Sequence, residues 1–132
     1  MDAAQALADL TEISSQIEAA VLFEEGGQIL GSTIADEDAS RALAAAAGTL
    51  LQDAAAFRGS GGEVTQLEAS VHDGSVFVVR DGPRRIVAVT GQAPTVGLVF
   101  YDLKSCLRGA AEDQDELPKR RRAPSKKADD EA

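Results

Sequence analysis

Two short stretches are apolar at both odd and even positions, and this pattern limits the possible folds more than any other feature of the chain. Residues 17–23 read IEAAVLF and residues 76–79 read VFVV. Neighbouring side chains of a β-strand point to opposite faces of its sheet, so strands of this kind are buried on both sides. We therefore expect an α+β fold in which helices cover both faces of a sheet.

Turn residues predict the partners of these strands. The turn EEGG at 24–27 joins 17–23 to a second strand at 28–33 and so forms a β-hairpin. The dipeptides Asp73-Gly74 and Asp81-Gly82 tolerate the positive φ angles of tight turns, so they separate the strands of an antiparallel meander. We place these strands at about 63–71, 74–80 and 84–90. The first of the three is polar and is expected at an edge of the sheet.

Apolar residues at helical spacing predict one helix before the first strand and another after the last. The first runs from Asp2 to about Gln16, with a stripe of Ala6, Leu7, Leu10, Ile13 and Ile17. The last begins after Pro94, a residue that suits the first turn of a helix. Its stripe consists of Val96, Phe100, Leu103, Leu107 and Ala110.

The helix expected from Asp36, its N-cap, to Phe57 has two unlike sides. One is an apolar stripe that we expect to face the core, formed by Ala39, Leu43, Ala46, Ala47, Leu50, Ala54 and Phe57. The other is lined with small residues where a solvated face normally carries charges: Arg41, Ala45, Gly48, Gln52 and Ala56, with Ala44, Leu51 and Ala55 at its margin. Such a side suits close contact with another body, although alanine is also simply the best helix former.

Charge separates a domain at 1–111 from a tail at 112–132. The chain has 132 residues and a net charge of −9; the domain carries 7 basic and 15 acidic side chains, and the tail 6 and 7. An acidic body argues against a nucleic-acid partner for the folded domain, because phosphate binding needs a cationic face. The absence of a leader and of a long apolar run predicts a soluble, cytoplasmic protein without a membrane partner.

The tail offers almost nothing to bury, so we expect it to be disordered. Its basic clusters are Lys119, Arg120, Arg121, Arg122, Lys126 and Lys127. An acidic protein, nucleic acid and anionic lipid are alternative partners, and plain solvation is the commonest role of such a segment. The sequence leaves the partner of the tail open.

The sequence predicts neither a catalytic centre nor a cofactor. His72, Asp73 and Ser75 are neighbours on a turn rather than a triad arranged in space. The single histidine and the single cysteine, Cys106, rule out the usual metal clusters, and Cys106 is expected to be a small core residue. The glycines at 59–62 lack the lysine and hydroxyl of a phosphate-binding loop. We therefore expect a protein that is not an enzyme.

Four segments in this order resemble the Roadblock family, named after a dynein light chain. They are AAVLF at 19–23 before a turn, QILGS at 28–32 after it, the Ala/Leu-rich helix, and PTVGLV at 94–99 at the start of the last helix. The resemblance covers about residues 3–110. It implies the profilin-like order αββαβββα, with a five-stranded antiparallel sheet, one helix on one face and two on the other.

The resemblance also implies a function. Roadblock domains dimerise through the second helix and the third strand, and bacterial members bind and regulate small Ras-like GTPases without a catalytic residue of their own. We therefore expect a homodimer that regulates such a GTPase. The predicted interface is Arg41, Ala44, Ala45, Gly48, Leu51, Gln52, Ala55, Val64, Gln66 and Glu68, with Arg41 and Arg58 as partner contacts.

Two other functions remain open at this stage. A scaffold subunit of a signalling or motor complex would pair with other chains without touching a GTPase. A small-molecule sensor would need an apolar cavity with a few convergent polar groups, which is difficult to form when both faces of the sheet are filled. On the predicted dimer interface, Gly48→Glu or Leu51→Glu should separate the protomers and leave each one folded.

Overall fold

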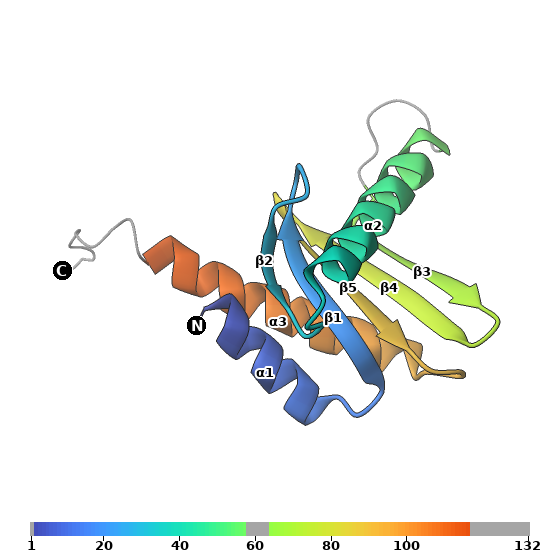
Figure 1. Ribbon diagram of the computed structural model, residues 1–132, viewed down its shortest axis with the longest axis horizontal. Helices are drawn as coiled ribbons and strands as arrows, with labels where there is room; N and C mark the ends of the chain where they lie inside the picture. The colour runs from blue at the N-terminus through green and yellow to red at the C-terminus, as the bar shows by residue number, and fades with distance from the viewer. Residues whose placement is uncertain (1, 58–63, 117–132) are drawn as a thin grey trace.

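The computed structural model describes residues 2–57 and 64–116, and the side chains up to residue 111. Three helices and five strands follow the predicted order (Figure 1). In chain order they are α1 (Ala3–Ile13), β1 (Ile17–Glu24), β2 (Ile29–Ser32), α2 (Glu37–Phe57), β3 (Gln66–Val71), β4 (Gly74–Asp81), β5 (Arg84–Thr90) and α3 (Val96–Glu116).

The strands form one antiparallel sheet in the order β2-β1-β5-β4-β3. The two strands that the sequence marks as apolar on both sides, β1 and β4, flank β5 in its interior. Val87 of β5 lies opposite Val21 of β1 on one side and opposite Val78 of β4 on the other. The polar strand β3 lies at an edge, as predicted.

Helices cover both faces of the sheet, and the two faces differ (Figure 1). Along each strand, alternate side chains belong to one or the other of two buried clusters, as the period of a strand requires. Leu22, Phe77 and Ile86 pack with α1 and α3, whereas Val21 and Val78 pack with α2. The predicted arrangement of two helices on one face and one on the other is confirmed.

The first helix ends earlier than its apolar pattern suggests. It stops at Ile13, and the N–H of the C-cap Ser14 donates to the Leu10 carbonyl. Ile17 is buried but already belongs to β1, while Ile13 is 65% exposed. The helical spacing of these two isoleucines therefore spans the boundary between a helix and a strand.

The β3–β4 turn has the predicted strand bounds, Val71 and Gly74, but Gly74 is not one of its turn residues. Val71 pairs with Gly74, so the turn consists of His72 and Asp73, and Gly74 begins β4. A Cβ at Gly74 would lie 2.0 Å from the Thr90 carbonyl oxygen, which is why only glycine fits there. Close approach of the backbone, rather than a positive φ, explains this glycine.

The core face of α2 also differs from the prediction. Asp36 caps the helix by accepting from the N–H of Asp38 at 2.9 Å. The side chains that face the sheet are Ser40, Ala44, Ala47 and Leu51, whereas Ala39, Ala46 and Phe57 of the predicted core stripe are exposed. A hydrogen bond of 2.7 Å between the hydroxyls of Ser40 and Ser32 anchors this orientation.

The last helix continues beyond the predicted boundary at residue 111. It runs to Glu116, so the first five residues of the predicted disordered tail are helical. The remaining tail, 117–132, lies outside the described residues. No helix in the described part of the chain is long and apolar enough to cross a membrane.

Candidate protein-interaction site

A strip of small side chains runs along one flank of α2. Ala45 and Gln52 are exposed, and Gly48 and Ala55 are half-buried. A Cβ placed on Gly48 would meet no atom within 4 Å, so the glycine opens onto free space rather than onto packed neighbours. The small-residue flank, Ala45, Gly48, Gln52 and Ala55, is therefore accessible to a partner.

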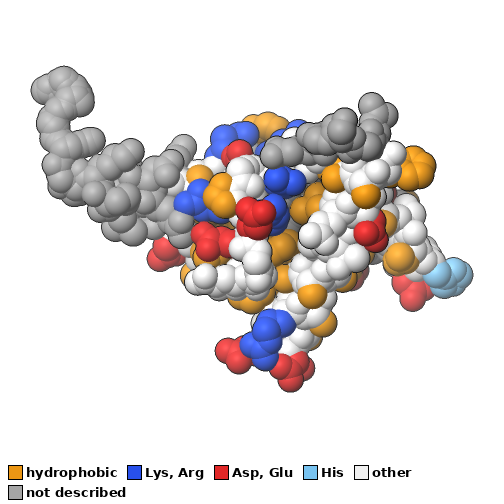
Figure 2. Space-filling view, turned by 90° about the horizontal axis from the view of Figure 1, so that it is seen from above, with side chains coloured by type: hydrophobic (Ala, Val, Ile, Leu, Met, Phe, Trp, Pro, Cys, Tyr) orange, Lys and Arg blue, Asp and Glu red, His pale blue; other side chains and the backbone are white. Residues whose placement is uncertain are grey.

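The small-residue flank lines a surface groove of about 410 Å³ whose other wall is the β1–β2 turn. That turn contributes Glu24, Glu25, Gly26 and Gly27. Both glycines have positive φ angles, 96° and 94°, a conformation that other residues rarely adopt. Figure 2 shows basic and acidic side chains gathered beside the helix on this side of the molecule.

Two arginines complete the lining of this groove. Arg80 of β4 and Arg85 of β5 lie opposite one another in the sheet and both line the groove. Arg85 is 7% exposed and donates from Nη1 to the Pro83 carbonyl at 2.6 Å. Burial and this hydrogen bond hold the Arg85 guanidinium in one orientation. Sequence analysis missed both arginines, because only the register of β4 and β5 places them beside α2.

The opposite flank of α2 faces β3. Successive helical residues are about 100° apart, so the side opposite the small-residue flank carries Ala39, Ala46, Leu50 and Phe57. Figure 1 shows that α2 crosses the sheet with the β1–β2 turn on one side and β3 on the other. We call these four residues the β3-side flank. Leu50 is half-buried, and the other three are exposed, Phe57 at 92%.

The edge strand beside this flank carries apolar side chains without full cover. Among the described strands, β3 pairs with β4 alone. Leu67 of β3 and Val76 of β4 are half-buried against the α2-side cluster, and Val71 is 59% exposed. A free backbone edge next to uncovered apolar side chains is the combination that pairs with another chain.

The structure places the predicted interface residues in different surroundings, some buried against the sheet and others exposed on the groove flank. Ala44 and Leu51 are 2% and 4% exposed, because they form the contact of α2 with the sheet. The prediction that Ala44 and Leu51 lie at the margin of the side away from the core is therefore wrong. The small-residue flank lies beside the β1–β2 turn, so it does not form one continuous surface with β3.

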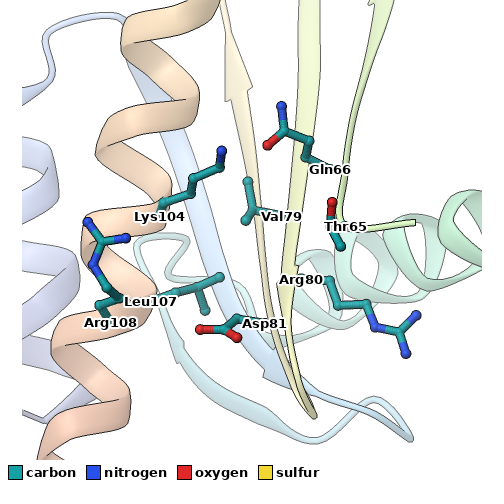
Figure 3. A pocket seen from close by; sticks show the side chains of 8 residues that line it. All are labelled: Thr65, Gln66, Val79, Arg80, Asp81, Lys104, Leu107 and Arg108. Carbon is teal, nitrogen blue, oxygen red and sulfur yellow. The ribbon is translucent and has the colours of Figure 1, made fainter. Parts of the chain in front are cut away.

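The predicted β3 residues point to different sides of the sheet. Val64, just before the strand, is half-buried against the α2-side cluster. Gln66 faces α3 across a pocket of about 270 Å³, where its amide and the Lys104 ammonium point toward one another (Figure 3). Arg80 points away to the other side. Glu68 accepts from the Ser75 hydroxyl at 3.2 Å within the same chain.

Of the two arginines predicted to contact a partner, the structure describes only Arg41. Arg41 is exposed near the start of α2 and is held by Glu37 and Asp38 of the same turn, with 3.9 Å between Arg41 Nη1 and Glu37 Oε1. These intrahelical pairs satisfy its charge at the surface. Arg58 lies outside the described residues.

Groups that could support catalysis are not assembled in the described part of the chain. No cluster of three or more His, Cys, Asp or Glu side chains could hold a metal ion there. His72 is almost fully exposed, 3.9 Å from Asp73 at the β3–β4 turn. Cys106 is a buried core residue, as predicted, and burial together with the nearby Asp9 charge raises the pKa of its thiol to about 12. A thiol of this kind is a poor nucleophile at neutral pH.

A five-stranded antiparallel sheet with one helix on one face and two on the other is the architecture of Roadblock/LC7 domains. A Roadblock/LC7 domain from Streptomyces avermitilis matches with a TM-score of 0.76 at 19% identity, covering 86% of this chain and 98% of that one. MglB from Myxococcus xanthus matches with a TM-score of 0.66 at 13% identity, covering 86% and 92%. The gliding protein MglB from Thermus thermophilus matches with a TM-score of 0.65 at 17% identity, covering 86% and 89%.

The chain therefore has the Roadblock/LC7 fold, and the predicted resemblance is confirmed at the level of the fold. By sequence, no protein-family model and no curated protein matches it.

Proposed function

We propose that this protein is a non-catalytic homodimeric module that binds and regulates a small Ras-like GTPase. The observation that carries the proposal is the uncovered edge of β3 beside the exposed apolar β3-side flank of α2. A second copy related by a two-fold axis would pair β3 with its own β3 and place the two α2 helices side by side. Each protomer would thereby bury the apolar surface that it now exposes.

The structure changes which residues we assign to the dimer. Ala39, Ala46, Leu50 and Phe57 lie on the flank of α2 that is turned toward β3, whereas Ala45, Gly48 and Gln52 line the groove on the other flank. The dimer contact is thus assigned to the β3-side flank and the backbone of β3. The predicted effect of Leu51→Glu also changes, since a carboxylate at a 4% exposed position would unfold the protomer.

The small-residue flank and its groove then remain free for a different partner. The fold supports a GTPase as that partner, because the Roadblock resemblance implies GTPase regulation in bacteria. The groove offers a smooth helix surface of small side chains beside the β1–β2 turn, against which a partner can pack closely. Regulation would follow from binding alone, by favouring one conformation of the GTPase.

The experiment is a binding titration with Ras-like GTPases of the same cell, each loaded with GDP or with a non-hydrolysable GTP analogue. We expect one nucleotide state to bind at least tenfold more tightly, in a complex that contains two copies of this chain. Gly48→Glu fills the groove without touching the core and should weaken binding by a similar factor. Ala42→Glu, on the outer side of the same helix, is the matched control and should bind normally.

Nucleotide-independent binding, or no binding to any of these GTPases, would contradict the regulatory role. The alternative of a scaffold subunit predicts that the dimer forms but that its partners are insensitive to nucleotide. The same titration therefore separates the two functions.

A further inference from the structure

A second groove lies between α1 and α3, on the face of the molecule opposite α2. It encloses about 320 Å³, and its lining includes Ala6, Leu10 and Cys106 from the buried cluster. Ile13 of α1 lines it too and is 65% exposed. The helices run side by side in opposite directions, so the groove extends along α3 from Gly109 to Asp102 (Figure 1).

Three carboxylates line the same groove. Asp9 and Glu12 come from α1, and Asp102, 6% exposed, comes from α3. Within the described residues, none of the three takes part in an ion pair. Asp9 accepts a hydrogen bond of 3.1 Å from the Gln5 amide, which carries no charge. The groove therefore combines an apolar lining with uncompensated negative charge, which suits a basic segment.

The cations of α3 do not line this groove. Lys104 and Arg108 both line the pocket on the side of α3 that faces β3 and β4 (Figure 3). Arg108 donates to the hydroxyl of Ser105, a groove residue, at 3.4 Å, but is not itself part of the groove lining. A basic segment entering the α1–α3 groove would thus meet carboxylates in the groove itself.

The chain contains such a segment directly after α3. Lys119, Arg120, Arg121, Arg122, Lys126 and Lys127 follow the end of the helix at Glu116. Seven helical residues separate Gly109 from Glu116, a distance of about 10 Å. An extended chain covers about 3.3 Å per residue, so residues 117–122 can turn back to Gly109 and residues 123–127 can continue toward Asp102.

We propose that the basic tail at 119–127 docks in the α1–α3 groove of its own chain. Its cations would lie beside Asp9, Glu12 and Asp102, and its aliphatic stems and Pro124 would cover Ile13. Covalent attachment makes this contact intramolecular, so a weak affinity is enough to keep the groove occupied. The proposal is independent of the GTPase and of the dimer.

The test is paramagnetic relaxation in the full-length protein carrying a spin label at Ser125→Cys. The native Cys106 is 5% exposed and its thiol has a pKa raised to about 12, so the label reacts at position 125 alone near pH 7. We expect the label to broaden the amide signals of Asp9, Glu12 and Ser105 severalfold more than those of α2. Adding salt to about 0.5 M should remove most of this broadening, because the contact is between charges.

Substitutions in the groove supply the matched control. Asp9→Asn with Glu12→Gln should reduce the broadening at least threefold, whereas Glu37→Gln with Asp38→Asn, an exposed acidic pair on α2 outside the groove, should leave it unchanged. Broadening confined to the end of α3, or unaffected by the groove substitutions, would overturn the proposal. So would broadening that arises only between a spin-labelled chain and a separate ¹⁵N-labelled one, since the tail would then bind a second copy.

Discussion

The two faces of the sheet are covered to different extents. On the α1/α3 face, Leu10, Phe77 and Leu103 are at most 1% exposed, and the rings of Phe77 and Phe100 meet edge to face at 5.0 Å. On the α2 face, the helix contributes chiefly small side chains, and Val76 of the sheet stays half-buried. One face is closed within a single copy, whereas the other leaves apolar side chains exposed that the proposed dimer would cover.

This difference has a simple origin in side-chain size. Ala44 and Ala47 allow α2 to approach the sheet closely, but they bury little area, and hydrophobic stabilisation scales with the area removed from water. Of the larger apolar groups of α2, Leu51 packs against the sheet, whereas Leu50 and Phe57 lie on the flank that faces β3. The proposed dimer would bury these exposed apolar groups.

The largest expected loss of folding stability comes from truncating one leucine on each face of the sheet. Leu103→Ala should lower the free energy of unfolding by about 4 kcal/mol, because Leu103 is fully buried among large neighbours. Leu51→Ala should cost about 2 kcal/mol, because the alanine-rich surroundings of α2 lose fewer contacts. Urea denaturation monitored by circular dichroism measures both. Equal losses would contradict the difference between the faces.

A smaller effect on folding stability is expected from Cys106, whose thiol lies on the α1/α3 face and makes the stability depend on pH. The pKa of Cys106 is raised from 9.0 to about 12, so the unfolded chain loses this proton at lower pH than the folded one. The resulting stability is constant below about pH 9 and falls as pH rises toward 12, by about 1.4 kcal/mol per pH unit. Cys106→Ala should remove this part of the slope, which urea titrations at pH 8, 9 and 10 would reveal. An unchanged slope would show that the thiol is more accessible than its burial indicates.

The smallest expected effect concerns the polar anchor of α2. Ser40→Ala deletes the hydroxyl that lies 2.7 Å from Ser32 Oγ and should cost about 1 kcal/mol. The loss should be confined to the α2 face. Hydrogen exchange should therefore accelerate in α2 and remain unchanged in α1 and α3, and a uniform acceleration would show that the faces are coupled.

The sequence predicts the fold well because the informative patterns are local. The two-sided apolar strands require cover on both faces, and the glycine-containing turns set the order of the strands. The errors occur where tertiary contacts override a local pattern. Ile13 and Ile17 share a helical spacing but lie in different elements. Gly74 is required by the nearby Thr90 carbonyl, which the sequence cannot place.

The candidate site is less predictable for the same reason. A helical wheel identifies two unlike sides of α2, but in an alanine-rich helix hydrophobicity does not decide which side faces the sheet. A hydroxyl pair, Ser40 with Ser32, fixes the rotation, so that Ala44 and Leu51 of the predicted margin join Ala47 of the predicted core stripe against the sheet. The arginines of the groove, Arg80 and Arg85, become neighbours only through strand pairing.

The most direct test of the central claim is the molar mass of two α2 variants, measured by light scattering at high micromolar concentration. The wild type should form a dimer of twice the 13.7 kDa chain mass. Ala46→Glu, on the flank that faces β3, should give a folded monomer, and Gly48→Glu, on the groove flank, should remain a dimer. A monomeric wild type, or a dimer that Gly48→Glu breaks and Ala46→Glu does not, would contradict the account.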